Sequence, residues 1–288
     1  MPIINMYPET EDTFLGFPKN NFEESRIVIF PIPLELTTCY GKGTSLGPRA
    51  IIEASKQLEF FDINTKKSLA EDISFHTLPF LEIDKSGPEN NVKRIKDVVK
   101  KVLEYDKFLI SFGGEHTLSF GVINGFLEAF EEEFSVISFD AHADLRDSFQ
   151  GTKLSHACVM RRIYEKVPIA LFGTRMVSKE EYDFMLENKI SWCKEFSDKI
   201  LKNLPDKVYI SIDLDVLDPS IMPAVGTPVA EGWSVKNLIS AVEKISKNKE
   251  IIGFDVVELA PIPNFEAPNF IAAQIVYEIL NKILGEGK

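Results

Sequence analysis

Residues 134–144 read Phe134-Ser135-Val136-Ile137-Ser138-Phe139-Asp140-Ala141-His142-Ala143-Asp144. The first six residues form a mostly apolar run that predicts a buried strand. Alternate side chains of an extended backbone share one face, so we expect Asp140, His142 and Asp144 to leave the strand end together. Carboxylate and imidazole groups gathered in this way are typical metal ligands. The stretch therefore predicts a core strand with a metal site at its end.

A second stretch repeats the pattern. Residues 207–215 end in Tyr209-Ile210-Ser211-Ile212-Asp213-Leu214-Asp215. An apolar strand is predicted here over Lys207–Asp215, and its last two carboxylates, Asp213 and Asp215, are expected to share a face. Five potential ligands on two strand ends favour a metal cluster over a solvated loop.

The rest of the chain predicts strands that alternate with helices. Helices are expected around Pro48 and its successors, over a stretch with Val92, Ile95, Val99 and Val102 on one face, and from Phe270 to Leu284. This alternation is typical of an α/β fold with a mostly parallel sheet covered on both sides. The remaining strands are predicted at Arg26–Pro31, Lys107–Phe112, Pro168–Phe172 and Ile251–Val257.

Composition narrows the class of protein. The chain has 288 residues and no linker-like or repetitive segment, so one domain over residues 1–288 is expected, with an irregular N-terminal segment over 1–25. A net charge of −12 argues against a nucleic-acid partner. Three scattered cysteines, no signal peptide and no apolar run long enough to span a membrane predict a cytoplasmic protein without a membrane partner.

Polar side chains follow most of the predicted strands. In parallel sheets ligands bind beyond the carboxyl ends of the strands, so these residues are expected at one edge. They are His116 in Gly113-Gly114-Glu115-His116, the Asp140, His142 and Asp144 group, Asp213, Asp215, Asp218, and Glu258.

The predicted ligands are four aspartates and two histidines: His116, Asp140, His142, Asp144, Asp213 and Asp215. Without thiolates, they favour Mn²⁺ over a soft zinc site, with Mg²⁺, Fe²⁺ and Co²⁺ as weaker candidates. Six ligands suit two ions that share carboxylates. Four aspartates neutralise two divalent ions, and Glu258 adds a negative charge, so the site favours a cationic substrate such as a guanidinium.

Two further features have competing interpretations. His156 is a candidate proton shuttle because imidazole titrates near neutral pH, although its spacing equally fits a histidine in a surface loop. Residues 41–47 resemble a phosphate-binding loop, but the lysine precedes the last glycine, so a turn before a helix is favoured.

From about Ile27 to the C-terminus the chain resembles the ureohydrolase family of arginases and agmatinases. The resemblance rests on the motifs around His116, around Asp140 and around Glu258, on Ser211–Pro219, and on Gly226-Thr227-Pro228. It implies a three-layer α/β/α fold with a central, mostly parallel eight-stranded sheet. It also implies two Mn²⁺ ions per chain and a homo-oligomer, either a trimer or a hexamer.

The resemblance further implies a role for each residue. One ion would take His116, Asp140, Asp144 and Asp213; the other would take Asp140, His142, Asp213 and Asp215. A hydroxide between the ions would attack the guanidinium carbon, and Asp144 would pass a proton to the departing amine. Glu258 and Thr227 would hold the guanidinium, and His156 would act in substrate binding and in proton transfer to solvent.

The segment after Asp144 indicates the substrate. Residues 145–156 resemble agmatinases rather than the Asn- and Ser/Thr-rich loop of arginases, so agmatine, cleaved to putrescine and urea, is the expected substrate.

The sequence departs from the family in two places. Glu231 and Trp233 follow Gly226-Thr227-Pro228, where a Gly-Gly pair is usual, and both are expected near the pocket rim; Phe149 stands where a Tyr is common.

Three other interpretations stay open. The first is another ureohydrolase: an arginase, a guanidinobutyrase, a guanidinopropionase or a formiminoglutamase. The second is a one-zinc amidohydrolase of the deacetylase type, which the six-residue ligand set disfavours. The third is a non-enzymatic scaffold, whose mark would be a lost ligand, and all six ligand positions are present.

Overall fold

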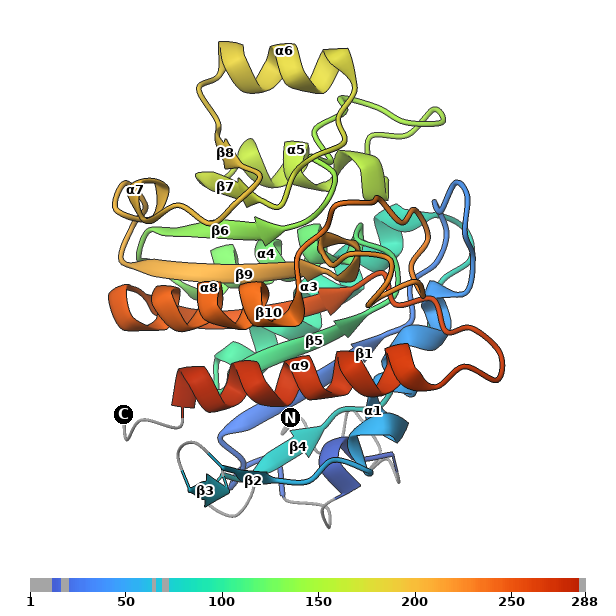
Figure 1. Ribbon diagram of the computed structural model, residues 1–288, viewed down its shortest axis with the longest axis vertical. Helices are drawn as coiled ribbons and strands as arrows, with labels where there is room; N and C mark the ends of the chain where they lie inside the picture. The colour runs from blue at the N-terminus through green and yellow to red at the C-terminus, as the bar shows by residue number, and fades with distance from the viewer. Residues whose placement is uncertain (1–11, 17–20, 64–65, 69–72, 285–288) are drawn as a thin grey trace.

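The computed structural model describes residues 12–16, 21–63, 66–68 and 73–284. A sheet of eight strands runs through its centre, and helices cover both faces (Figure 1). All pairs of neighbouring strands in this sheet are parallel, which confirms the predicted three-layer α/β/α fold. The order across the sheet is β4 (Phe75–Thr77), β1 (Ile27–Ile32), β5 (Phe108–Gly113), β10 (Glu250–Val257), β9 (Lys207–Asp213), β6 (Phe134–Phe139), β7 (Ile169–Phe172) and β8 (Ser191–Cys193).

Six of these strands match the predicted ones to within two residues at either end. Their burial explains the match, because β1, β6 and β7 are buried throughout and leave unbroken apolar runs in the sequence. The two strands at the sheet edges, β4 and β8, were not predicted. Each has three residues and β8 is only half-buried, so neither leaves a clear pattern.

Helices pack on the two faces of the sheet as separate layers. In Figure 1, α8 and α9 lie in front of the sheet, with α1 beside α9, while α3 and α4 lie behind it. The two layers close two hydrophobic clusters, one on each face. The helices are α1 (Gly47–Ser55), α3 (Pro88–Leu103), α4 (Leu118–Ala129), α5 (Val159–Tyr164), α6 (Lys179–Glu187), α7 (Asp198–Leu201), α8 (Val235–Asn248) and α9 (Ala267–Leu284).

Helix α3 shows how the sequence pattern produces the layer. Pro88 stands in its first turn, where no backbone N–H is needed, and Val92, Ile95, Val99 and Val102 are buried against the sheet and α4. The predicted helix here is confirmed, as are the helix that contains Pro48 and the final helix, which begins at Ala267 rather than at Phe270. Within the described residues, no helix is long and apolar enough to cross a bilayer.

Part of the predicted irregular N-terminal segment is ordered into the core. Phe14–Gly16 form one turn of 3₁₀ helix, and the Phe14 ring contacts the rings of Phe75 and Phe112. Residues 1–11 and 17–20 of that segment lie outside the described part of the chain. A separate antiparallel pair, β2 (Phe61–Asp62) and β3 (Lys67–Ser68), lies outside the main sheet.

Strand order decides where the polar residues meet. The last strand of the chain, β10, lies between β5 and β9, and β9 in turn pairs with β6. Val256 is in register with both Phe112 and Ile212, and Ile212 is in register with Phe139. The four central strands therefore end at the same level, and the residues that follow them surround one point.

Candidate active site

The backbone turns sharply where β6 ends. The strand stops at Phe139, the backbone bends at residues 141 and 142, and Asp144 has a positive φ of 52°. The expected alternation of Asp140, His142 and Asp144 along an extended strand is therefore wrong. A turn beyond the strand, rather than strand pleating, brings the three side chains to one side.

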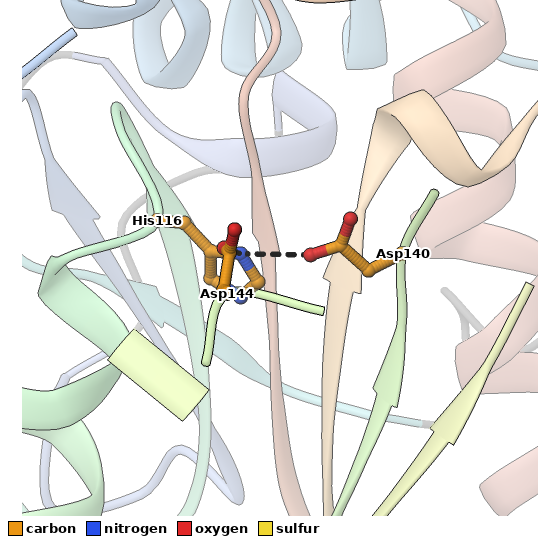
Figure 2. Close-up of side chains that lie close together, drawn as sticks. All are labelled: His116, Asp140 and Asp144. Atoms are coloured by element: carbon orange, nitrogen blue, oxygen red, sulfur yellow. Dashed lines mark ion pairs between the residues drawn. The ribbon is translucent and has the colours of Figure 1, made fainter. Parts of the chain in front are cut away.

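His116 lies at the deepest point of the site. It follows β5 and Gly114, where an added Cβ would lie 2.0 Å from the Leu34 carbonyl oxygen, so only glycine fits there. The His116 Nδ1 atom lies 3.0 Å from Asp144 Oδ2, 3.2 Å from Asp140 Oδ2 and 3.5 Å from Asp213 Oδ2. Figure 2 shows the imidazole beside the carboxylates of Asp140 and Asp144. Three carboxylates thus converge on one imidazole nitrogen.

His142 forms a second group beside the first. Its Nδ1 lies 2.8 Å from Asp215 Oδ2 and 3.7 Å from Asp140 Oδ1. Among the residues that the structure describes, two groups have metal-binding geometry: His116, Asp140 and Asp144, and Asp140, His142 and Asp215. Asp140 belongs to both because its two oxygens face different histidines. This arrangement brings together the six predicted ligands.

Asp213 is the last residue of β9, and Asp215 lies in the short turn that follows. The Asp213 Oδ1 atom accepts a hydrogen bond from the Asp215 N–H at 2.8 Å, and Asp215 Oδ1 accepts one from the Ala141 N–H at 2.9 Å. These bonds tie the end of β9 to the end of β6. Asp218 turns away from this cluster and instead accepts bonds from Ser220 and Gly232.

The cluster carries more negative charge than its own groups compensate. Burial, together with Asp215 and Asp140, raises the pKa of Asp213 well above its usual range, and burial and Asp140 also raise the pKa of Asp144, to about 7. His116 Nδ1 and Asp140 Oδ2 are buried and make no hydrogen bond within the described part of the chain. Unsatisfied ligand atoms that face each other in an acidic site fit a bound cation, so the residues present suit a metal.

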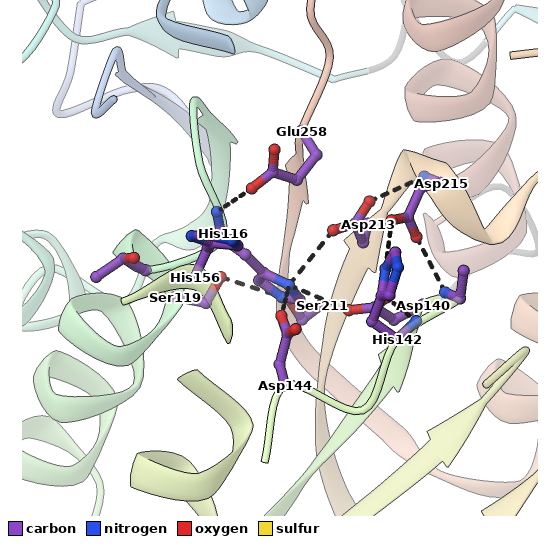
Figure 3. A network of polar contacts seen from close by, with 12 residues as sticks. His116, Ser119, Asp140, His142, Asp144, His156, Ser211, Asp213, Asp215 and Glu258 are labelled. Atoms are coloured by element: carbon purple, nitrogen blue, oxygen red, sulfur yellow. Dashed lines mark hydrogen bonds and ion pairs between the residues drawn. The ribbon is translucent and has the colours of Figure 1, made fainter. Parts of the chain in front are cut away.

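A buried network lies behind His116 (Figure 3). His116 Nε2 lies 2.9 Å from Ser211 Oγ, and the Ser211 hydroxyl donates to Asp255 Oδ1 at 2.7 Å. Tyr209 Oη also donates to Asp255, at 2.9 Å. No role was predicted for Ser211 or Asp255. A carboxylate within an otherwise apolar central strand, as at Asp255, is the sequence signal that could have found this network.

A cavity of about 290 Å³ opens above the cluster. Glu258, Thr227 and His156 line it together with predicted metal ligands. Glu258 directly follows β10 and has a positive φ of 67°, and its Oε1 accepts a hydrogen bond from the His116 N–H at 2.7 Å. Burial raises the pKa of Glu258 to about 8. All nine residues that were predicted to form the site therefore lie at or around one cavity.

The cavity wall favours cations. Among the residues that the structure describes, its lining includes five carboxylates and one guanidinium, that of Arg146. The Arg146 guanidinium lies 5.5 Å from the centre of the Phe149 ring, so part of its charge faces an aromatic surface. Phe149 lines the cavity where the family often carries a tyrosine.

The expected position of Glu231 and Trp233 near the pocket rim is wrong, because neither residue lines the cavity. The Trp233 side chain packs inward against the Phe139 ring, and its indole N–H donates to the Lys194 carbonyl at 2.7 Å. Glu231 is exposed to solvent. A large apolar ring gains more by burial than by standing at a polar rim.

Arg175, which had no predicted role, connects the loops around the site. Its guanidinium donates to the main-chain carbonyls of Asp215, Val216, Val229 and Ala230, at 2.8–3.1 Å. It thereby joins the turn after β9, which carries Asp215, to the loop that follows Thr227. A guanidinium has five N–H donors in a planar fork and can bond to several carbonyls at once. A lysine ammonium has three donors at a single point and cannot make the same set of bonds.

Ligand-type residues at the strand ends of a parallel sheet, below an acidic cavity, define a metal-dependent hydrolytic enzyme of the α/β class. The model of the arginase family matches residues 25–281. The chain therefore belongs to the arginase family of ureohydrolases, within its agmatinase-like branch, and it is a hydrolase.

The chain is similar to several named relatives and solved structures. The N(1)-aminopropylagmatine ureohydrolase of Synechocystis is 34% identical over 274 residues, covering 90% of each chain. The agmatinase of Pyrococcus horikoshii is 31% identical and covers 92% of this chain and 95% of its own length. The crystal structure of the agmatine ureohydrolase of Thermoplasma volcanium superposes with a TM-score of 0.83 at 29% identity, over 93% of this chain and 94% of that one.

Proposed function

We propose that the chain is a dinuclear manganese amidinohydrolase that cleaves agmatine to putrescine and urea. The observation that carries the proposal is the pair of His/Asp groups sharing Asp140 at the base of an acidic cavity. The proposal also takes the protein to act as a single domain over residues 1–288, in the cytoplasm, as a homo-oligomer (a trimer or a hexamer), on a small cationic substrate.

The six ligands would divide between two Mn²⁺ ions as the family resemblance implies, with Asp140 and Asp213 shared. Bound there, divalent ions supply Lewis acidity and make water nucleophilic at neutral pH. Close oxygen ligands and the absence of thiolates among them suit Mn²⁺ better than a structural zinc site.

The remaining residues act on the substrate and its protons. The carboxylate of Glu258 and the hydroxyl of Thr227 hold the guanidinium, which fixes the reacting carbon over the cluster. A carboxylate oxygen of Asp144 takes a proton from the attacking water and gives it to the departing amine nitrogen, so that water and guanidinium become urea and an amine. His156 exchanges protons between the cavity and solvent.

A second candidate substrate is N(1)-aminopropylagmatine. The Synechocystis relative is named for it and is slightly more similar to this chain than the agmatinase quoted above. The cavity wall also includes Tyr40 and Met176, whose side chains are 81% and 54% exposed, so it reaches the protein surface. A longer amine tail would have a path out of the site.

A substrate panel tests the proposal. Purified protein would be freed of metal with a chelator and reloaded with Mn²⁺, Mg²⁺, Co²⁺ or Zn²⁺. Release of urea would then be measured from agmatine, N(1)-aminopropylagmatine, arginine, guanidinobutyrate and guanidinopropionate, and release of formamide from formiminoglutamate. We expect Mn²⁺-dependent urea from agmatine or its aminopropyl derivative. Much faster release from arginine, formamide as the product, or full activity with one zinc per chain would contradict it.

Glu258→Gln is the matched variant for this panel. It preserves the shape of the side chain but removes the charge that pairs with a guanidinium, so we expect kcat/KM for agmatine to fall by roughly 10²-fold or more. The metal content should stay at the wild-type level because Glu258 is not among the six ligands. A wild-type kcat/KM in this variant would remove the assigned role of Glu258.

A further inference from the structure

Glu115 is a fully buried carboxylate that neither the predicted ligand set nor the proposed substrate contacts include. Its Oε2 accepts hydrogen bonds from the N–H groups of Leu36 and Thr37, at 2.8 and 2.6 Å. Its Oε1 accepts a bond from the Thr37 hydroxyl at 2.9 Å. Burying an acidic side chain costs free energy, and the three hydrogen bonds offset part of that cost. We therefore asked what else this carboxylate contacts through its partners.

The Thr37 hydroxyl connects this carboxylate to His156. The Thr37 Oγ1 atom lies 3.2 Å from His156 Nδ1, and it accepts a bond from the His156 N–H at 3.1 Å. A hydroxyl has one hydrogen and two lone pairs. Because that hydrogen is directed to Glu115, Oγ1 can only accept from the imidazole. Thr117 Oγ1, 3.3 Å away, competes for the second lone pair of Thr37 Oγ1. A hydrogen bond between Thr37 Oγ1 and His156 Nδ1 therefore requires a hydrogen on Nδ1.

Ser155 offers the opposite arrangement. Its Oγ lies 3.3 Å from His156 Nδ1 and, as a hydroxyl, could donate to an unprotonated Nδ1. The two neighbours therefore favour different tautomers unless Ser155 accepts as well. The Thr37 hydroxyl already donates its hydrogen to the Glu115 carboxylate, so toward Nδ1 it can act only as an acceptor. Its oxygen is also slightly closer to Nδ1 than that of Ser155.

The ring has little freedom to turn away from this contact. Phe149 packs edge to face against it, with 5.6 Å between the ring centres. Burial lowers the pKa of His156 to about 4, so the imidazole is neutral at pH 7 and has one N–H to place. His156 lines the cavity, and with Nδ1 turned to Thr37 the nitrogen left for that space is Nε2.

We propose that Glu115 and Thr37 are positioning residues that hold His156 in the Nδ1–H tautomer, so that Nε2 meets the cavity as a proton acceptor. A histidine whose second nitrogen is oriented by a carboxylate is a common device in catalysis; here a threonine hydroxyl stands between the two groups. The catalytic role of this tautomer depends on the proposed function. The assignment of the tautomer depends only on the hydrogen bonds.

The tautomer can be read directly from the nitrogen chemical shifts of the His156 ring. The full-length protein, both metal-free and loaded with diamagnetic Mg²⁺ or Zn²⁺, would be labelled with ¹⁵N at histidine, and the His156 signals assigned by loss in His156→Asn. The chain has four histidines, so the spectrum stays simple. We expect a protonated Nδ1 and a pyridine-type Nε2 in the wild type.

Three variants separate the contributions of the two hydroxyls. Thr37→Val keeps the side-chain shape and removes the acceptor, which leaves Ser155 free to donate, so we expect the Nε2–H tautomer to increase. Thr37→Ser keeps the hydroxyl and should retain Nδ1–H. Ser155→Ala, the matched control, should also retain it. A wild-type spectrum with Nε2–H, or a Thr37→Val spectrum identical to the wild type, overturns the proposal even if one variant fails to fold.

Kinetics distinguish this inference from the proposed function. In Thr37→Val we expect kcat for urea release to fall by roughly 10²-fold, the lower end of what a positioned acid–base group contributes, with KM changed far less. If this variant has a wild-type kcat although its tautomer is altered, the Nδ1–H tautomer does not contribute to catalysis. If the wild type releases no urea from any guanidino compound while the tautomers behave as expected, the proposed function is wrong. The assignment of the His156 tautomer to Glu115 and Thr37 would still hold.

Discussion

Ser211 lies directly behind His116, with its Oγ 2.9 Å from the imidazole Nε2 and on the side away from the carboxylates. Because the Ser211 hydroxyl donates to Asp255, its oxygen accepts from His116, which places the imidazole hydrogen on Nε2. The Nδ1 lone pair then faces Asp140 and Asp144. A histidine that binds metal commonly has its other nitrogen held in this way.

Ser211→Ala should therefore weaken metal binding without removing a ligand. Outer hydrogen-bond partners of metal-binding histidines typically contribute 10–100-fold to affinity, so we expect the dissociation constant for Mn²⁺ to rise by about that factor. The measurement is a competition titration against a metal-binding dye.

Ser135→Ala is the matched control. Ser135 is also fully buried, in the neighbouring strand β6, but its hydroxyl has no hydrogen-bond partner among the residues that the structure describes. Its loss should leave the Mn²⁺ affinity within about twofold, since it has no hydrogen bond to lose. Equal effects of the two substitutions would show that packing, rather than the bond to His116, is responsible.

Metal should stabilise the folded chain. Mn²⁺ at a hundred times its dissociation constant would add about 2.7 kcal/mol to the free energy of unfolding and raise Tm by roughly 5–10 °C. Scanning calorimetry with Mn²⁺ and with a chelator would measure this. Asp140→Asn should lose most of the shift because Asp140 belongs to both groups. A shift of the same size in that variant would argue for binding elsewhere on the protein.

Arg175→Lys should destabilise the protein and impair substrate binding. One ammonium cannot replace a guanidinium that donates to several carbonyls, so we expect a loss of about 2–3 kcal/mol in the free energy of unfolding. The loop that carries Thr227 should loosen, which would raise KM for the guanidino substrate. Urea unfolding and steady-state kinetics test both effects. Arg94→Lys, in α3, is the comparison and should change neither by much.

Alkylation should distinguish two cysteines. Cys39 is exposed and lines the cavity, whereas Cys158 is buried and its pKa is raised to about 11 by burial and by Asp144. A thiol with a raised pKa stays protonated, and therefore unreactive, at pH values well below 11. At pH 8, iodoacetamide should modify Cys39 and spare Cys158, as mass spectrometry would show.

The same treatment should slow urea release, because the added group would stand in the cavity wall. Cys39→Ser should keep its urea release during the treatment. If that variant is inactivated as fast as the wild type, the inhibition comes from another site.

Asp218 should make stability depend on pH in acid. Hydrogen bonds from the Ser220 hydroxyl and from the Ser220 and Gly232 N–H groups lower its pKa to about 2, against 3.8 for the free side chain. A carboxyl with a lowered folded-state pKa stabilises the fold above pH 4 and loses that contribution as the pH falls from about 4 towards 2. Asp218→Asn should therefore lower Tm more at pH 6 than at pH 3. A Tm difference that is constant over this range would contradict the assigned bonds.

Much of the fold follows from local patterns. The central strands are buried on both sides, so their apolar runs stand out, and α3 shows its buried face every three or four residues. The short edge strands β4 and β8 lack such a signal because three residues give too little periodicity. The bend at Asp144 was also missed, since nothing in an alternating Asp-Ala-His-Ala-Asp run indicates a positive φ.

The residue types at the strand ends were determined by the sequence alone, because ligand chemistry belongs to each side chain wherever it lies. Only the tertiary structure decided which of these groups meet. Pairing of β10 between β5 and β9, strands far apart in the chain, brings Glu258 beside His116. Long-range pairing also brings Asp255 behind Ser211, Glu115 behind Thr37, and the Arg175 fork onto two separate loops. Such contacts depend on how the whole sheet is ordered, and no local stretch of residues encodes that order.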